Sequence, residues 1–259
     1  MMANKRKNRK GRQRNTVKPK TAAQIGDEIR TQIRIIIQQY DHLKSPLKTI
    51  PEVQPDGQTM YRIDGADSYE LLQDRILDFA GSVWQLKDRL KKYASLMTLD
   101  LRNRDASGNP LKTDIEAEAP KSLALMLCAD LWTDEKHAEH NNRSGFAPKF
   151  NGMSLPGIDG IAYDGGSKLG RFYRKTADPV PYKVEVIDHT HTYSFGHAVD
   201  LIIEAFHYWI PLLRQFECLS PRHPESHFIL DAFDRIDADV KANQKVRETR
   251  PKTPYMPAT

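Results

Sequence analysis

The chain has 259 residues, of which 39% are hydrophobic and 28% are charged, and its formal net charge is +5. This apolar fraction excludes a wholly disordered chain, and the lack of any apolar run of about 18 residues excludes a membrane-spanning helix. Residues 1–20 contain nine lysines and arginines and no acidic residue, so residues 21–259 carry a net charge of −4.

Residues 1–20 are predicted to form a disordered basic tail, because they hold too few apolar groups to offset the entropy of ordering. Their charge density suits the phosphate backbone of RNA or DNA. The residues expected to bind nucleic acid are Lys5, Arg6, Lys7, Arg9, Lys10, Arg12 and Arg14. A solubilising tail without a dedicated partner is the alternative. The segment lacks the apolar core of a secretory signal, so we expect a soluble, cytoplasmic protein that does not bind membranes.

Five amphipathic patterns predict helices in a domain that spans residues 21–245. The first pattern opens with Thr21, three residues before Gln24, which is the spacing of a capping box. The predicted helices run from Thr21 to about Tyr40, from about Asp67 to Met97, from about Pro120 to His140, from about Gly196 to Cys218 and from about Phe228 to Gln244. Residues 246–259, which contain three prolines, are predicted to form a flexible C-terminal tail.

Residues 144–194 differ from the helical patterns around them. The stretch from Gly152 to Gly166 is rich in turn residues, and Arg171–Lys175 and Tyr182–Ile187 are typical of short strands. We therefore expect a small β-meander inserted between the third and fourth helices. The predicted fold class is mainly α, a bundle of about five helices with this β-insertion.

The two cysteines, Cys128 and Cys218, both lie within apolar helical patterns. A thiol in such a position usually behaves as a small hydrophobic group. Free thiols are therefore expected, in keeping with a cytoplasmic location.

The third predicted helix changes character toward its end. At 100° per residue, Asp130, Asp134 and His137 share the face that is apolar one and two turns earlier. A carboxylate on a core-facing surface must be hydrogen-bonded or paired, because burying it alone costs several kcal/mol. Lys87 lies at the edge of the second helix's apolar stripe, so a contact of Asp130 with Lys87 or with an arginine is predicted. A structural ion pair without chemistry is the alternative.

The fourth predicted helix also carries a polar row, formed by His197, Asp200, Glu204 and His207. Its apolar residues centre on the opposite side. Such a row is typical of a surface helix, so we expect it to face solvent.

Three segments together resemble a class of uncharacterised bacterial proteins. They are V83-W-Q-L-K-D-R-L90, A129-D-L-W-T-D-E-K-H137 and A205-F-H-Y-W-I-P-L-L213. This class is similar to the HEPN superfamily, which includes RNA-cleaving toxins and nucleotide-binding modules. The resemblance covers about residues 67–217 and implies an up-down helical bundle, often dimeric, which in some members serves host defence or a toxin–antitoxin system.

The resemblance also implies site residues. Lys87 and Asp88 match a "K-D" element, and Asp130, Lys136 and His137 match a "D…K-H" element. The chain departs from the pattern in two ways. The asparagine expected between Asp130 and Lys136 is absent, and the Arg-x4-6-His motif of the catalytic members does not fall on the third helix.

Metal chemistry is not expected from the histidine pattern. The pair His137 and His140 and the pair His189 and His191 each supply two nitrogens, whereas zinc needs three or four protein ligands. We therefore expect no metal and no cofactor. A metal-independent ribonuclease needs a general base near a cation, because RNA supplies its own 2′-hydroxyl nucleophile. His137 would be that base.

Three functions remain open from the sequence. The favoured one is binding of RNA or DNA through the basic tail. The second is ribonuclease activity centred on His137, with Lys136, Asp130 and Lys87 as the other catalytic residues. The third is a protein–protein interaction module without catalysis, for which the helices would pair with a second protein or a second copy of the chain.

Overall fold

The computed structural model of the protein describes residues 20–64, 69–97, 103–104, 110–111, 115–136, 143–154, 160–162, 171–175, 177–178, 180–181, 183–222 and 225–249. Secondary structure in these segments is mainly helical, with small antiparallel sheets, as the sequence predicts. The basic residues from Lys5 to Arg14 and the residue His137 lie outside the described segments.

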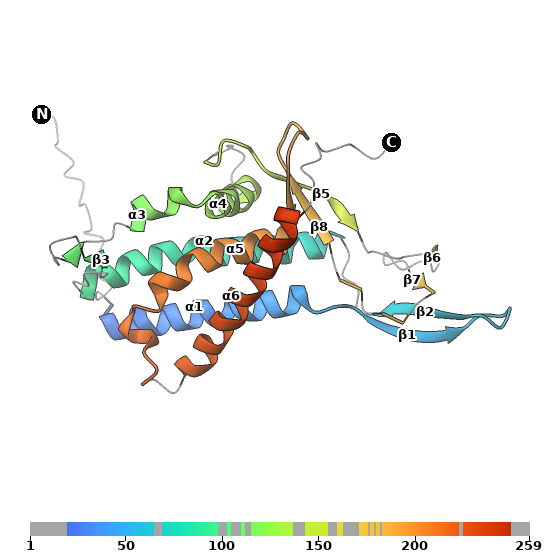
Figure 1. Ribbon diagram of the computed structural model, residues 1–259, viewed down its shortest axis with the longest axis horizontal. Helices are drawn as coiled ribbons and strands as arrows, with labels where there is room; N and C mark the ends of the chain where they lie inside the picture. Colours follow the sequence, from blue (N-terminus) through green and yellow to red (C-terminus); the bar gives the residue numbers. More distant parts are fainter. Residues whose placement is uncertain are drawn as a thin grey trace, which may run out of the picture.

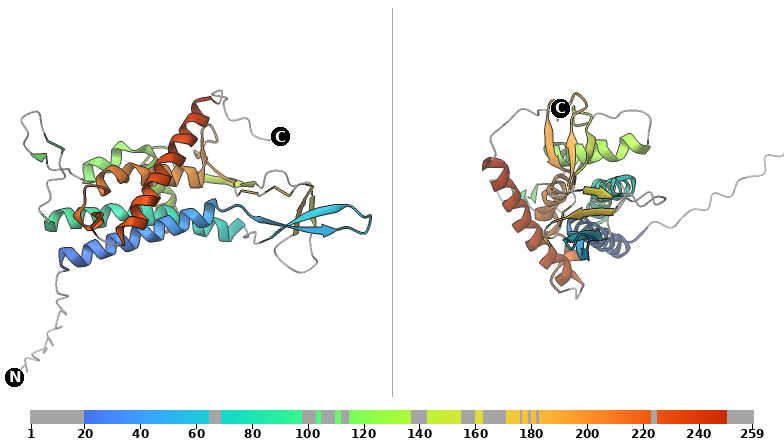
Figure 2. Two further views of the ribbon diagram at one scale, coloured as in Figure 1. Left: turned by 60° about the horizontal axis from the view of Figure 1, so that its bottom comes forward. Right: turned by 90° about the vertical axis from the view of Figure 1, so that its right-hand side faces the viewer.

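Helices α1, α2 and α5 run roughly along one axis, α4 lies across this axis (Figure 2), and α6 crosses the bundle obliquely (Figure 1). The helices are α1 (Ala22–Lys44), α2 (Tyr69–Met97), α3 (Ile115–Glu118), α4 (Leu123–Lys136), α5 (Ala198–Leu213) and α6 (Ser226–Thr249), with 3-10 turns η1 (Ala119–Lys121) and η2 (Glu217–Leu219). None of the helices within the described residues has the length and apolar character needed to cross a membrane.

Helix α1 shows why these segments become helices and pack together. Thr21 caps the first turn by accepting a hydrogen bond from the Gln24 amide, and the Gln24 side chain accepts one from the Thr21 amide. The isoleucines spaced along one face are completely buried, at Ile25, Ile29, Ile33, Ile36 and Ile37. Burying such a side chain stabilises the fold by about 1.5–3 kcal/mol, so this stripe holds α1 on the bundle.

The predicted third and fourth helices are longer than the observed ones. Pro120 belongs to the separate turn η1, and α4 begins only at Leu123 after Ser122, whose hydroxyl accepts a hydrogen bond from the Leu125 amide. A serine hydroxyl that accepts a hydrogen bond from a first-turn amide caps the helix, which explains why α4 begins at Leu123. Helix α5 ends at Leu213 instead of continuing to Cys218, which falls in η2.

The predicted β-meander is wrong as a single unit, because its strands belong to two different sheets. The strands are β1 (Lys48–Val53), β2 (Thr59–Asp64), β3 (Asn103–Arg104), β4 (Pro110–Leu111), β5 (Lys149–Ser154), β6 (Gly160–Ala162), β7 (Arg171–Arg174), β8 (Lys183–Ile187) and β9 (Ser194–His197). Strands β5, β8 and β9 form one sheet beside the bundle, whereas β6 and β7 extend the hairpin β1–β2.

The hairpin β1–β2 was not predicted, and it projects beyond the end of the bundle opposite the start of α1 (Figures 1 and 2). Its turn is closed by a hydrogen bond from the Gln54 amide to the Gln58 carbonyl, and Gly57 adopts a φ of +82°, which favours glycine. Pro51 lies within β1, which is an edge strand of its sheet. A proline inside a strand pattern argues against a central strand, but an edge position tolerates it.

The polar row of α5 is only partly exposed to solvent, which corrects the prediction. His207 Nε2 lies 2.9 Å from an oxygen of Asp237, and Asp200 accepts a hydrogen bond of 2.9 Å from Asn243. Both partners belong to α6, which packs against this side of α5. The row therefore forms a polar helix–helix interface, because α6 covers the face that an isolated helix would leave wet.

Both cysteines are buried and carry no disulfide, as predicted. Burial raises the pKa of the Cys128 thiol and of the Cys218 thiol above the ordinary range. Both groups therefore stay protonated near neutral pH and contribute packing instead of nucleophilic chemistry.

Candidate functional site

Asp130 lies on the core-facing side of α4, as predicted, and its exposed fraction is 0%. Its partners differ from the predicted ones. One carboxylate oxygen accepts a hydrogen bond of 2.8 Å from the Arg143 amide and the other accepts one of 2.7 Å from the Ser144 amide. Two amide donors satisfy a buried carboxylate without a cationic side chain. Asp130 thus contacts an arginine, as predicted, but through the backbone amide of Arg143, and within the described residues it forms no ion pair with Lys87.

Trp84 on α2 connects the predicted residues. Lys87 Nζ lies 4.5 Å from the centre of the indole ring, and Arg143 Cζ lies 5.1 Å from it. Both distances are within the range of cation–π attraction. Trp84 is 7% exposed, so its ring packs into the core beside the largely buried side chain of Lys87. The ring therefore has no open face on which nucleobases could stack.

Lys87 pairs with Glu116 of α3. Its ammonium group lies 3.1 Å from one Glu116 oxygen, and the other Glu116 oxygen lies 2.9 Å from Lys91. The hydrogen bonds from Lys91 and Lys87 lower the pKa of the Glu116 carboxyl below its usual range. Glu116 is substantially exposed, so each pair contributes at most about 1 kcal/mol.

Lys87 and Lys136 lie on two helices that cross. Helix α4 lies across α2 (Figures 1 and 2), and the two touch where Gly81 faces Trp132. Lys87 lies six residues beyond Gly81 on α2, and Lys136 lies four residues beyond Trp132 on α4. Of the predicted catalytic residues, the structure links Lys87 with Asp130 through Trp84 and Arg143, and the side chain of Lys136 lies outside the part that the structure describes.

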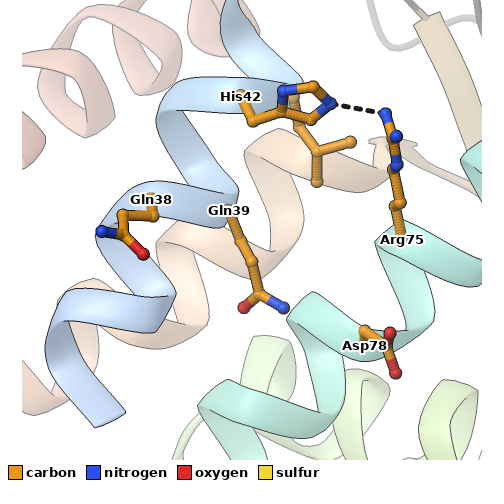
Figure 3. A pocket seen from close by; sticks show the side chains of 6 residues that line it. Gln38, Gln39, His42, Arg75 and Asp78 are labelled. Carbon is orange, nitrogen blue, oxygen red and sulfur yellow. Dashed lines mark hydrogen bonds between the residues drawn. The ribbon is translucent and has the colours of Figure 1, made fainter. Parts of the chain in front are cut away.

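A second group of functional side chains was not predicted. It lines a pocket of about 350 Å³ between α1 and α2, formed by Gln38, Gln39, His42, Leu43, Arg75 and Asp78 (Figure 3). In the sequence His42 is a basic residue in the last turn of α1, where it reads as a partner of the helix dipole. The only sequence feature that pointed to this group is the spacing of Arg75 and Asp78, which lie three residues apart on one helix face. It was not sufficient, because the contact with His42 depends on how α1 and α2 pack.

Comparison of the chain with protein-family models, curated proteins and solved structures finds no match. The function is therefore inferred from the charge and geometry of the chain's own residues.

Proposed function

We propose that this protein binds RNA or DNA through the basic segment of residues 1–20. The observation that carries the proposal is the separation of charge along the chain. Residues 1–20 contain nine basic residues and no acidic residue, whereas residues 21–259 carry a net charge of −4. Attraction to a phosphate backbone is therefore concentrated in this segment, while the rest of the chain is on balance repelled.

The attachment of the basic segment supports the proposal. Lys20 forms an ion pair with Glu28, about two turns beyond the Thr21 cap of α1. The segment thus leads directly into a capped helix that is buried along one face in the bundle. A basic segment anchored in this way would hold bound nucleic acid at the end of the bundle where α1 begins (Figure 1).

Neutralising the segment tests the proposal. A variant with glutamine at Lys5, Arg6, Lys7, Arg9, Lys10, Arg12 and Arg14 should bind short labelled single-stranded RNA at least about 100-fold more weakly than the unchanged chain, at about 0.1 M salt. For the unchanged chain, log K against log salt should fall with a slope of about −5, since each of the seven phosphates would contribute about −0.7. Fluorescence anisotropy over a salt series measures both quantities.

The matched control replaces neutral residues of the same segment, Asn4, Asn8, Gln13 and Asn15, with alanine and leaves every charge in place. It should bind like the unchanged chain. Equal binding by the neutralised variant and the control would overturn the proposal and place nucleic-acid binding, if any is measured, on the bundle.

We also propose that the bundle is HEPN-like and that its second candidate function is metal-independent cleavage of RNA with His137 as general base. Arg143 favours this function, because Asp130 anchors its backbone and its guanidinium group lies over Trp84, beside α4. A fixed guanidinium group could stabilise the negative charge that develops on a phosphate during cleavage. Lys136 ends α4 immediately before His137.

Histidine substitution tests this second function. Cleavage of total RNA should fall by about 100-fold or more in His137→Ala, since a general base contributes roughly that factor. His140→Ala, three residues away, should cleave as fast as the unchanged chain. The unchanged chain should still cleave RNA after a chelator has removed metal ions. If it does not, or if His137→Ala and His140→Ala cleave equally fast, His137 is not the general base of a metal-independent reaction. Circular dichroism of each variant checks that the helices are intact.

A further inference from the structure

The turn between β8 and β9 meets the segment that leads into β5, and the contact is made at Phe146. We call these two segments, residues 143–147 and 188–193, the Phe146 junction; the turn stands at the top of Figure 1. The Phe146 carbonyl oxygen lies 3.3 Å from the His189 amide nitrogen and 3.2 Å from His189 Nδ1. The Phe146 ring packs edge-to-face with Tyr193, with 6.4 Å between the ring centres. His189 and Tyr193 therefore share one contact residue.

The Phe146 junction is held in one conformation. The carboxylate of Asp188 is buried and accepts hydrogen bonds of 2.7 Å from the Thr192 amide and 2.8 Å from the Tyr193 amide. Among the described residues, those other than glycine with a positive φ are Ala147, at +44°, and His191, at +58°. Both belong to the junction. Strained backbone of this kind clusters at ligand sites, and a preordered turn would lose little entropy when a ligand binds.

His189 presents one hydrogen-bond acceptor in a fixed direction. Because a carbonyl oxygen only accepts, the bond to Phe146 keeps a proton on Nδ1. Nε2 of the neutral imidazole is then an acceptor. His189 is exposed, and within the described part of the chain its Nε2 atom has no partner. Such an acceptor matches a hydroxyl donor and does not match a phosphate oxygen, which only accepts.

Tyr193 and Arg143 supply the other two groups that bind single-stranded nucleic acid. Tyr193 is 59% exposed, so a base can stack on its ring, in contrast to the buried ring of Trp84. Arg143 is exposed, and its guanidinium group has no hydrogen-bond partner among the described residues. It lies three residues before Phe146, a span of at most about 11 Å, so its donors reach a phosphate beside the junction.

From this arrangement we infer that the Phe146 junction binds single-stranded RNA and distinguishes it from DNA. A base would stack on Tyr193, the ribose 2′-hydroxyl would donate to His189 Nε2, and a phosphate would accept from Arg143. DNA lacks the 2′-hydroxyl, so it would keep two of these contacts and lose the one with His189. The inference rests on the proposed binding of nucleic acid and names RNA as the ligand. The basic segment supplies attraction, and the junction supplies selectivity.

Oligouridine and oligodeoxyuridine of equal length isolate the contact with His189, because they differ only in the 2′-hydroxyl groups. In fluorescence anisotropy, the unchanged chain should bind the RNA about 5-fold more tightly than the DNA, which is the effect of one hydrogen bond. His189→Ala should bind both oligomers with the affinity of the DNA. His227→Ala is the matched control, because His227 is exposed on α6, outside the junction. It should keep the preference for RNA.

Substitution of Tyr193 tests the stacking contact separately. Tyr193→Ala should weaken binding of both oligomers about 10-fold and keep the preference for RNA, since stacking involves the base and not the sugar. Tyr193→Phe keeps the ring and should bind like the unchanged chain. Phe228→Ala, which removes an aromatic ring that is 52% exposed on α6, is the control and should leave both affinities unchanged. Circular dichroism of each variant checks that the helices are intact.

The variant with the seven neutralised basic residues separates this inference from the proposal for the basic segment. It should bind both oligomers weakly and still prefer RNA, because the junction is unchanged. A mononucleotide tests the junction directly in this variant. In NMR spectra with isotope-labelled histidine, uridine 3′-monophosphate should shift the imidazole nitrogen signals of His189, and the 2′-deoxy nucleotide should shift them much less.

Three outcomes would overturn the inference. One is equal affinity of the unchanged chain for RNA and DNA. Another is a preference for RNA that persists in His189→Ala. The third is that neither nucleotide shifts the His189 signals and Tyr193→Ala binds like the unchanged chain, which would leave the junction as a surface for a protein partner. If neutralising the basic segment leaves the affinities unchanged, the role of that segment is refuted, and the tests of His189 and Tyr193 still decide the role of the junction.

Discussion

Replacement of Asp130 by alanine is expected to lower the free energy of unfolding by about 3–5 kcal/mol, measured by urea denaturation. The carboxylate is fully buried and is the acceptor for the amides of Arg143 and Ser144. Each hydrogen bond to a charged group contributes roughly 1.5–3 kcal/mol, and the variant loses both. It also leaves two donors without a partner in a site that water reaches poorly.

Hydrogen exchange should show that the loss is local as well as global. In Asp130→Ala, the amides of Arg143 and Ser144 should exchange much faster than in the unchanged chain, while the amides of α1 keep their protection relative to the new global stability. Asp130→Asn keeps one acceptor oxygen and should lose about half as much stability. Asp231→Ala, an exposed aspartate of α6, is the control and should change stability by less than about 0.5 kcal/mol. A similar loss in both alanine variants would mean that Asp130 has no special structural role.

Gly81→Ala should destabilise the protein, although the same change in an exposed helix stabilises it by about 0.8–1.0 kcal/mol. A β-carbon at Gly81 would lie 2.4 Å from the indole nitrogen of Trp132 and 2.5 Å from its Cδ1 atom. Real β-carbons do not approach other atoms so closely, so α2 and α4 would have to move apart. We expect a loss of about 1–3 kcal/mol in the free energy of unfolding.

A double-mutant cycle identifies the cause. Trp132→Leu removes the ring that the new methyl group would meet, so Gly81→Ala should cost at least about 1 kcal/mol less in that background. Additive effects of the two substitutions would show that the glycine matters for another reason, such as backbone geometry. A stabilising Gly81→Ala would show that the contact between α2 and α4 is looser than its geometry indicates.

The apolar stripes were sufficient to predict most of the bundle. In α6, for example, Ile229, Phe233, Ile236 and Val240 were placed on one face from their spacing, and all four are buried. The capping box at Thr21 was predicted from two residues and is present. Local signals of this kind are reliable because a helix buries one face whatever its neighbours are.

The sheets and the polar contacts could not be predicted in the same way. Strands β6 and β7 join β1 and β2 across about a hundred residues of chain, and no local pattern specifies such a partner. Asp200 and His207 were predicted to face solvent. This prediction was wrong because it considered α5 alone, whereas α6 covers that face. The burial of Asp130 was predicted correctly, but its partners are backbone amides thirteen and fourteen residues later, which carry no side-chain signature.

Charge along the chain, the helical segments and the inward direction of Asp130 all follow from residue order, since each depends on composition or on the 3.6-residue period of a helix. The meeting of His42 with Arg75 and the approach of Lys87 and Arg143 to Trp84 follow only from the packing of whole helices. The physical reason is that a helix period specifies the face on which a side chain lies, whereas its neighbour depends on the direction and offset of the next helix.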